Sequence, residues 1–470
     1  MFFFVPEIYM IYTLGLFLGP DLRGIQMRVV LIAPAATSYI WRKRRAAFTM
    51  PPMALPLLAS LTPPEADVRL IDEAVEDVDL KLDADLVGLS AMTANVSRAY
   101  ALADHFRSRG IPVVMGGVHP SSLPQEALQH CDAVVIGEAE NLWPQVVQEA
   151  AQGRLERIYE NSAPVLLETL PAPRWDLLQA KRYFIPQTVQ VSRGCPMACS
   201  FCSVSSYFGR SHRSRPIPQV IEEVKALPRK LFIFVDDNIA GDPDTAKELF
   251  ATMIPLQKKW VGQCSLSISE DAELLNLATR SGCIGLLIGF ESISPAVLRS
   301  IGKRVNLGHK YEEAIRRIHA RSIHIQGSFI FGFDDDTPEG IQSTVHFVKQ
   351  NRLTGVNYCH LTPFPGTKLY ADLEKGGRLL HRDWARYDRQ NIVFRPRHFT
   401  PKELQDQIFW AYHQTYNWRS FWQRRPFSFQ QFSLYLALNF GYMKGVRKME
   451  RDAQKSRQES PLDSRALAGS

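Results

Sequence analysis

Cysteine is scarce in this chain, with seven residues among 470, and three of the seven fall within one short stretch. A small secreted scaffold held by disulfides would be far richer in cysteine, and an odd set on one loop cannot pair neatly. The sequence therefore excludes a disulfide-stapled fold. Each of the other four lies in or beside an apolar run and is expected to be a buried structural thiol: Cys131, Cys264, Cys283 and Cys359.

A hydrophobic run that fits a membrane span or a signal peptide is also missing. Residues 1–19 are apolar and aromatic, but they contain Pro6 and Glu7 and begin without basic residues. A strand-like run with its own methionine follows at Met27. We interpret residues 1–26 as a start-site extension or disordered tail; a membrane-facing tail is the competing interpretation.

The rest of the composition is that of an ordinary globular protein. The hydrophobic share is 45% and the charged share 22%, and the length is enough for two to four domains. We expect a cytoplasmic protein, because a reducing compartment suits the cysteine loop described next.

The informative stretch is the loop that carries Cys195, Cys199 and Cys202, with gaps of three and then two residues. A four-iron cluster normally takes four thiolates, one for each iron. Three thiolates leave one iron open to bind a small molecule and pass it an electron. Zinc is the weaker alternative, because it would need a fourth ligand and usually paired CxxC knuckles.

This CxxxCxxC spacing, with Phe201 before the last cysteine, resembles the radical S-adenosylmethionine (SAM) superfamily. The resemblance implies a [4Fe-4S] cluster on Cys195, Cys199 and Cys202 whose open iron holds SAM. It also implies a 5′-deoxyadenosyl radical and an electron donor such as flavodoxin or ferredoxin. The spacing alone indicates only a cluster with a vacant position.

Residues 27–150 alternate apolar strands with helix-like segments, which indicates a parallel sheet. The pattern predicts a flavodoxin-like (Rossmann-like) α/β domain whose ligands sit at the carboxyl ends of the strands. The predicted strands are 28–33, 68–72, 86–90, 112–115 and 133–136.

Small and polar residues follow three of these strands, where glycine would let a ligand approach the backbone. Tight turns alone would explain them equally well. The pattern looks like the cobalamin-binding domain that precedes the core of many radical SAM enzymes. The resemblance implies cobalamin contacts at Ser90, Thr93, Gly116, Gly117, His119, Gly137 and Glu138.

One motif of other cobalamin proteins is absent. The Asp-x-His-x-x-Gly sequence that supplies a lower axial histidine does not occur, and the loop after the first strand reads Ala33-Pro34-Ala35-Ala36-Thr37. The expectation is cobalamin bound base-off, without histidine on the cobalt.

Residues 151–185 are rich in proline and are predicted to be a linker. Strand and helix signals resume after it, and residues 186–375 are predicted to form a partial (β/α)6 TIM barrel, the fold of the radical SAM core. Residues 376–470 are predicted to be an α-rich aromatic region with a basic tail. The predicted strands are 189–192, 231–235, 264–268, 284–289, 325–331 and 356–361.

Polar residues again follow these strands, where carboxylates and hydroxyls could bind a ribose and an ammonium group. Turn-forming Asp and Asn are the alternative explanation for 236–238. By resemblance, the SAM contacts are Phe201, Glu291 and Ser292, with Asp237 and Ser267 as weaker candidates.

From Asn417 onward the chain has ten Lys and Arg against four Asp and Glu, together with nine aromatic residues. Such a segment can lie on an anionic membrane, here the inner face. The other interpretation is a packed helix with a solvated tail. An aromatic cluster is expected to pack over the barrel mouth, with a plain hydrophobic core as the alternative; its members are Trp384, Tyr387, Trp410, Tyr412, Tyr416 and Trp418.

The sequence therefore predicts a cobalamin-dependent radical SAM enzyme, with methyl transfer to an unactivated carbon as the main hypothesis. A cobalamin-dependent cyclase or rearrangement enzyme is the alternative. An RNA-modifying methylthiotransferase is disfavoured, because residues 1–150 hold only Cys131 and no second cluster. The expected partner is a small-molecule substrate, lipid or isoprenoid in the closest resemblance, and no nucleic acid.

Overall fold

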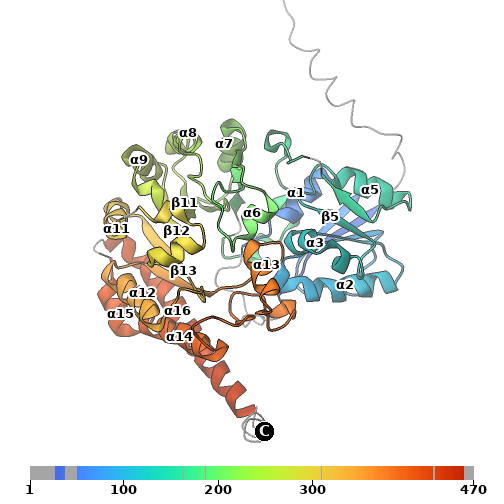
Figure 1. The fold of residues 1–470 in the computed structure, drawn as a ribbon. Coiled ribbons are helices and arrows are strands. Elements are labelled where there is room, and N and C mark those ends of the chain that lie inside the picture. The colour runs from blue at the N-terminus through green and yellow to red at the C-terminus, as the bar shows by residue number, and fades with distance from the viewer. Residues whose placement is uncertain are drawn as a thin grey trace, which may run out of the picture.

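The computed structural model describes residues 27–36, 50–161, 163–185, 187–308, 310–426 and 429–459. Two parallel sheets, each with its own helices, lie side by side (Figure 1). The predictions made for residues 1–26 lie outside the described residues.

The first sheet has the order β2-β1-β3-β4-β5-β6 in the described residues, and every pairing is parallel. Its central strands are continuous apolar runs because helices cover both faces. The order of the first five is that of a flavodoxin-like sheet, as predicted. The strands are β1 (Arg28–Ala33), β2 (Asp67–Asp72), β3 (Leu86–Ser90), β4 (Val113–Gly116), β5 (Ala133–Ile136) and β6 (Ile158–Glu160).

Helix α2 (Val96–Ser108) packs on one face of this sheet, and α1 (Ala54–Leu61) and α5 (Trp143–Ala151) pack on the other (Figure 1). Two short helices, α3 (Val118–Ser122) and α4 (Pro124–Ala127), follow β4. The segment 151–185, predicted to be a linker, contributes β6 to the sheet edge.

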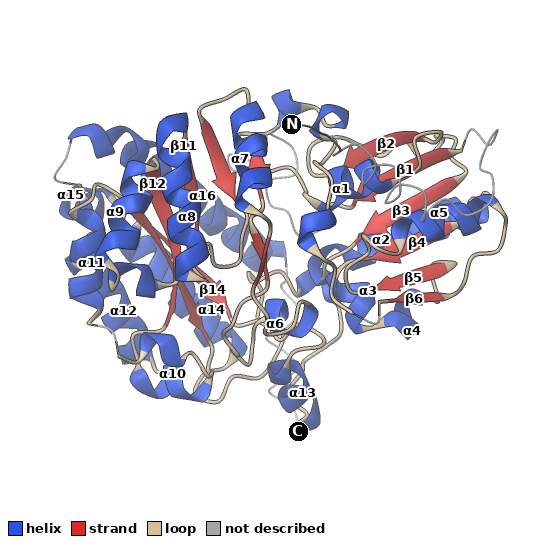
Figure 2. Ribbon diagram, turned by 90° about the horizontal axis from the view of Figure 1, so that it is seen from above, coloured by secondary structure: helices blue, strands red, loops and turns tan. Residues whose placement is uncertain are grey.

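The second sheet has the order β14-β13-β12-β11-β10-β7 in the described part of the chain and is also parallel. Its curved strands with helices on the outside form the expected partial barrel (Figure 2). The strands are β7 (Thr188–Val189), β10 (Leu231–Phe234), β11 (Lys259–Cys264), β12 (Cys283–Glu291), β13 (His324–Phe331) and β14 (Gly355–His360). The helices between and after them are α7 (Ile217–Ala226), α8 (Pro243–Met253), α9 (Ala272–Arg280), α10 (Pro295–Ser300), α11 (Tyr311–His319), α12 (Pro338–Gln350) and α13 (Lys368–Lys375).

The predicted strand at 264–268 was wrong. The strand is β11, which ends at Cys264, and a 3₁₀ turn occupies Leu266–Ser269. Exposed Lys259 and Gln263 interrupt the apolar pattern of β11 and hid it. Ser267 therefore follows its strand rather than lining it.

Helices α14 (Pro401–Thr415), α15 (Trp418–Arg424) and α16 (Phe429–Glu459) close the open edge of the second sheet at β14. The backbone N–H of Val356 donates to the hydroxyl of Tyr416 at 2.6 Å, and that of Tyr358 donates to Tyr412 at 3.0 Å. Tyrosine hydroxyls thus satisfy an edge that would otherwise invite another strand.

Trp384 and Tyr387 do not pack over the barrel mouth, contrary to expectation. They join the hydrophobic core on the α2 face of the first sheet. The Nε1–H of Trp384 donates to Glu126 at 2.8 Å, across 258 residues of sequence. The chain therefore returns to complete the first domain after the second sheet is built.

Within the described residues, no helix is both long and apolar enough to cross a membrane.

Candidate functional site

The three clustered cysteines lie on one loop between β8 (Ser192–Arg193) and α6 (Ser203–Tyr207). All three are free, half-buried thiols. Burial raises the pKa of Cys195, Cys199 and Cys202, that of Cys199 to about 12, so each favours the neutral thiol until a cation or metal compensates. No three His, Cys, Asp or Glu side chains of the described residues converge as a single-ion site requires.

Two carboxylates after β10 hold this loop in place. Asp236 is fully buried and accepts from the backbone N–H of Val191 at 3.2 Å and from the hydroxyl of Ser192 at 2.6 Å. Asp237 accepts from the backbone N–H of Gly194, although burial, the larger effect, raises its pKa. Asp237 therefore helps to position the cysteine loop, and its contact with SAM stays a prediction.

Gly194 makes the close turn into the loop. Its φ is 84°, and a Cβ there would clash with the backbone carbonyl oxygen of Ser211. Only glycine fits a position with both constraints.

Glu291 ends β12 in a strained conformation that aims its side chain into the barrel. Its φ is 61°, and the register of β12 against β13 shifts between Gly289 and Glu291. A non-glycine residue in the left-handed region costs on the order of 1–3 kcal/mol and often marks a functional site. Its carboxylate binds the ammonium of Lys303 at 2.6 Å.

Lys303 is the residue that the sequence reasoning missed here. Burial alone would lower its pKa, but Glu291 and the nearby thiols of Cys199 and Cys195 outweigh burial and raise it. Lys303 thus carries a positive charge beside the cysteine loop. No motif spacing singles it out, because it follows α10 at a distance of twelve residues from Glu291.

The other predicted SAM contacts interact with residues outside this pair. The ring of Phe201 packs edge-on against Phe333 at 5.8 Å. The hydroxyl of Ser267 bonds that of Ser265 at 2.6 Å, and Ser292 accepts from the N–H of Ser294 at 3.0 Å.

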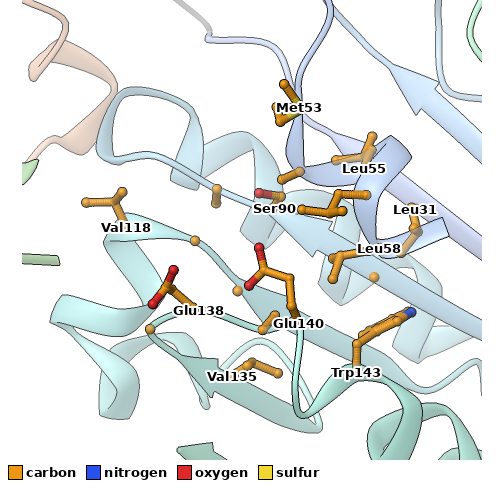
Figure 3. Close-up of a pocket in the computed structure, with 18 of the residues that line it drawn as sticks. Leu31, Met53, Leu55, Leu58, Ser90, Val118, Val135, Glu138, Glu140 and Trp143 are labelled. Carbon is orange, nitrogen blue, oxygen red and sulfur yellow. The ribbon is translucent and has the colours of Figure 1, made fainter. Parts of the chain in front are cut away.

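A cavity of about 260 Å³ opens at the carboxyl ends of β3, β4 and β5 (Figure 3). Apolar side chains make up much of its lining, Trp143 among them, and Ser90, Glu138 and Glu140 add polar groups (Figure 3). Gly116, Gly117 and Gly137, three of the predicted cobalamin contacts, also line it.

Thr93 and His119 do not line this cavity. His119 is completely buried, with Nδ1 at 3.2 Å from the hydroxyl of Thr93 and Nε2 at 3.3 Å from Glu126. The ring of Trp384 contacts the ring of His119 edge-on, with the ring centroids 5.0 Å apart. His119 is therefore a satisfied core residue, and the described residues that line the cavity include no histidine.

The cavity wall also contains residues from the cysteine segment, which the sequence reasoning did not connect with it. Arg193 and Tyr207, before and after the cysteines, both line the cavity. The hydroxyl of Tyr207 donates to the carbonyl of Gly137 at 2.5 Å. Residues on both sides of the cysteine loop therefore form part of the cavity wall.

The segments that carry the cysteine loop and the cavity each match a known family. The radical SAM superfamily model matches residues 189–348, and the B12 binding domain model matches residues 44–147.

Several characterised proteins are similar over most of their length. Bacteriochlorophyllide d C-12(1)-methyltransferase of Chlorobaculum tepidum is 34% identical over 75% of this chain and 80% of its own. The C-8(2)-methyltransferase of the same organism is 31% identical, over 78% and 86%. The hopanoid C-2 methylase of Rhodopseudomonas palustris is 27% identical, over 72% and 67%.

The fold is shared with OxsB, a cobalamin-dependent SAM radical enzyme solved with aqua-cobalamin and SAM. The TM-score is 0.65 at 15% identity, over 92% of this chain and 75% of that one. From the relatives of 30% identity or more and from the two matched domains, this chain belongs to the cobalamin-dependent radical SAM enzymes, which use a [4Fe-4S] cluster, SAM and cobalamin.

Proposed function

We propose that this chain methylates an unactivated carbon of a large, mainly apolar ring substrate of the bacteriochlorophyllide class. The observation that carries the proposal is the similarity to two bacteriochlorophyllide d methyltransferases, at 34% and 31% identity over at least 80% of each. The hopanoid methylase is less similar, at 27%, so a polycyclic lipid is the second substrate class.

The residues of the cysteine loop fit a [4Fe-4S] cluster. Three free thiols on one loop supply three ligands, and Lys303 offsets the negative charge of the thiolates. Glu291 would accept a hydrogen bond from an ammonium or hydroxyl group of SAM, and Lys303 would donate a hydrogen bond to the carboxylate of SAM. When bound, the cluster with SAM supplies hydrogen-atom abstraction and cobalamin supplies the methyl group.

The cavity of the first domain fits part of a cobalamin. Its apolar lining, which includes Trp143, suits an aromatic base, and the polar groups of Ser90, Glu138 and Glu140 suit amide groups. Because the described lining holds no histidine, we propose that the cobalt receives no imidazole from this cavity. A small electron-transfer protein, flavodoxin or ferredoxin, would supply the electron.

Product mass tests the proposal. The anaerobically reconstituted chain is given bacteriochlorophyllide d and SAM with a deuterated methyl group. The product should be heavier than the substrate by one deuterated methyl group. A product that loses hydrogen and gains no methyl would instead support the cyclase or rearrangement alternative. Turnover of a hopanoid but not of the bacteriochlorophyllide would leave methyl transfer standing and change the substrate class.

We also propose that α15 and α16 touch an anionic membrane surface. Three large side chains there are exposed, Trp418 by 50%, Trp422 by 53% and Phe440 by 44%. Trp418 and Phe440 border a hollow that also holds Lys444, Arg447 and Arg451. Exposed tryptophan beside basic residues matches the interface between headgroups and acyl chains.

The same helices also have a packed side, which decides how to test them. Arg424 is buried and donates to the carbonyl of Thr415 at 3.0 Å and to Asn439 at 2.7 Å. Deleting the segment would therefore disturb the fold, and point variants are needed.

The double variant Trp418→Ser, Trp422→Ser should lose binding to phosphatidylglycerol vesicles that the unchanged chain shows at low salt. Trp410→Ser is the matched control, because Trp410 is exposed by 37% on α14. If the unchanged chain fails to sediment with these vesicles at low salt, the surface has no membrane role.

A further inference from the structure

Two arginines face each other on either side of the cysteine loop. Arg193 on β8 pairs directly with Arg213 on β9 (Arg213–Ser214) in a short antiparallel ladder. Directly opposed residues project from the same face, and like charges in that arrangement repel. The two positive charges therefore need a shared partner.

Glu138 is that partner, and it belongs to the other domain. It binds Arg193 at 2.7 Å with one oxygen and Arg213 at 2.9 Å with the other. Arg193 also binds Glu140 at 2.6 Å, and its Nε–H donates to Gln190 at 2.9 Å. We call Arg193, Arg213, Glu138 and Glu140 the interdomain clamp.

The clamp is buried and electrically balanced. The side chains of Arg193, Glu138 and Glu140 are exposed by only 5%, 8% and 10%, and that of Arg213 by 18%. Two guanidinium groups meet two carboxylates, and Arg213 also donates to the carbonyl of Val165 at 2.7 Å. Removing one member would leave an uncompensated charge in a buried site, which is strongly unfavourable.

The clamp connects two places that bind different groups. Its arginines stand on the strands that enter and leave the cysteine loop. Its carboxylates stand on the loop after β5, and Glu138, Glu140 and Arg193 line the cavity. The ion pairs therefore tie the loop after β5 to the strands on either side of the cysteine loop.

We propose that the interdomain clamp couples the cysteine loop to the cavity, so that a cluster on the loop strengthens cobalamin binding. This inference rests on the proposed cluster and cobalamin sites. By linkage, cobalamin must strengthen retention of the cluster by the same factor. A factor of about ten is typical of such coupling.

The test measures cobalamin affinity rather than turnover. Anaerobic equilibrium dialysis with hydroxocobalamin is performed on the full chain with its cluster and after iron removal by a chelator. The unchanged chain should bind about tenfold more tightly with the cluster. Arg193→Gln should bind hydroxocobalamin equally with and without the cluster. In this variant, added cobalamin should no longer slow the release of iron.

Arg213→Gln provides the second variant, because Arg213 is less buried and does not line the cavity. Arg213→Gln should reduce the ratio of cobalamin affinity with the cluster to that without it, although Arg213 itself does not contact the cavity. If Arg193→Gln does not fold, Arg213→Gln still tests the coupling. Arg210→Gln is the matched control, since Arg210 is exposed on the same segment and should keep the full ratio.

Equal affinities in the unchanged chain, or an unchanged ratio in both clamp variants, would overturn the coupling. An iron assay separates this from failure of the proposed function. If the chain takes up iron but binds cobalamin equally with and without the cluster, only the coupling is contradicted. If it takes up no iron, the coupling and the proposed cluster site are both contradicted.

Discussion

Glu291 and Lys303 form a buried ion pair of 2.6 Å inside the barrel, and Glu291 holds a left-handed backbone conformation, φ 61°, to make it. A glutamate gains nothing locally from that conformation, so the surrounding structure must impose it. The pair places one carboxylate and one ammonium beside the thiol of Cys199.

Replacing Glu291 by glutamine should therefore weaken SAM binding by at least about tenfold, because the variant keeps the shape and loses the charge. Anaerobic equilibrium dialysis with SAM measures the effect, and iron content should not change. Glu312→Gln, at an exposed position of α11, is the control. Unaltered SAM affinity in Glu291→Gln would remove Glu291 from the site.

Two adjacent glycines offer a matched pair in the first domain. At Gly117, φ is 99° and a Cβ would lie 2.6 Å from the carbonyl oxygen of Ala91, whereas at Gly116 the nearest atom is 3.7 Å away. Gly117→Ala should lower the free energy of unfolding by at least about 2 kcal/mol, and Gly116→Ala by less than about 1 kcal/mol.

Thermal unfolding without cobalamin measures this difference. The clash at Gly117 is with the chain itself, so the cost should be present before any cofactor binds. If Gly117→Ala has the same melting temperature as the unchanged chain and loses only cobalamin binding, the glycine is required for the ligand rather than for the fold.

Trp384→Phe should destabilise the first domain by about 1–3 kcal/mol, because the variant loses the hydrogen bond to Glu126 and part of a buried ring. Hydrogen exchange across residues 93–126 should accelerate. Trp410→Phe, at a 37% exposed position, should not change it. Exchange that accelerates only around the barrel would contradict the observed packing.

His360 predicts a loss of stability in acid. Burial lowers its pKa from 6.5 to about 4, and its ring Nδ1 lies 3.0 Å from the carbonyl of Arg389. The unfolded chain takes up the proton near pH 6.5 and the folded chain only near pH 4, so stability falls as the pH drops through this window. The contribution is on the order of 3 kcal/mol.

Asparagine at 360 keeps a donor near the Nδ1 position and does not titrate. His360→Asn should therefore show a smaller fall in melting temperature between pH 7 and pH 5 than the unchanged chain. His319 and His324, whose pKa values burial also lowers to about 4, shift both proteins alike. Equal falls in both proteins would show that His360 does not carry the effect.

The sequence predicted well those elements whose hydrophobic pattern matches the burial of their residues. Strands β1, β3 and β5 are apolar runs with helices on both faces, and their bounds match the prediction. Strand β11 has exposed Lys259 and Gln263, so its pattern did not separate it from the turn that follows.

The candidate site was harder to predict because its key contacts are long-range. Residues after a parallel strand can be placed at one edge of a sheet, but that edge has an inner and an outer side. Ser90 faces the cavity, while His119 turns into the core toward Glu126. The contact of Arg193 with Glu138 spans 55 residues, and no local pattern announces it.

Iron content and SAM cleavage, measured in one anaerobic preparation, test most directly whether the cysteine loop holds a cluster that cleaves SAM. The unchanged chain should hold about four irons and form 5′-deoxyadenosine. Cys199→Ala should lose both, while Cys131→Ala, at a buried thiol of the first domain, should keep both. Formation of 5′-deoxyadenosine by Cys199→Ala, or no iron in the unchanged chain, would contradict the account.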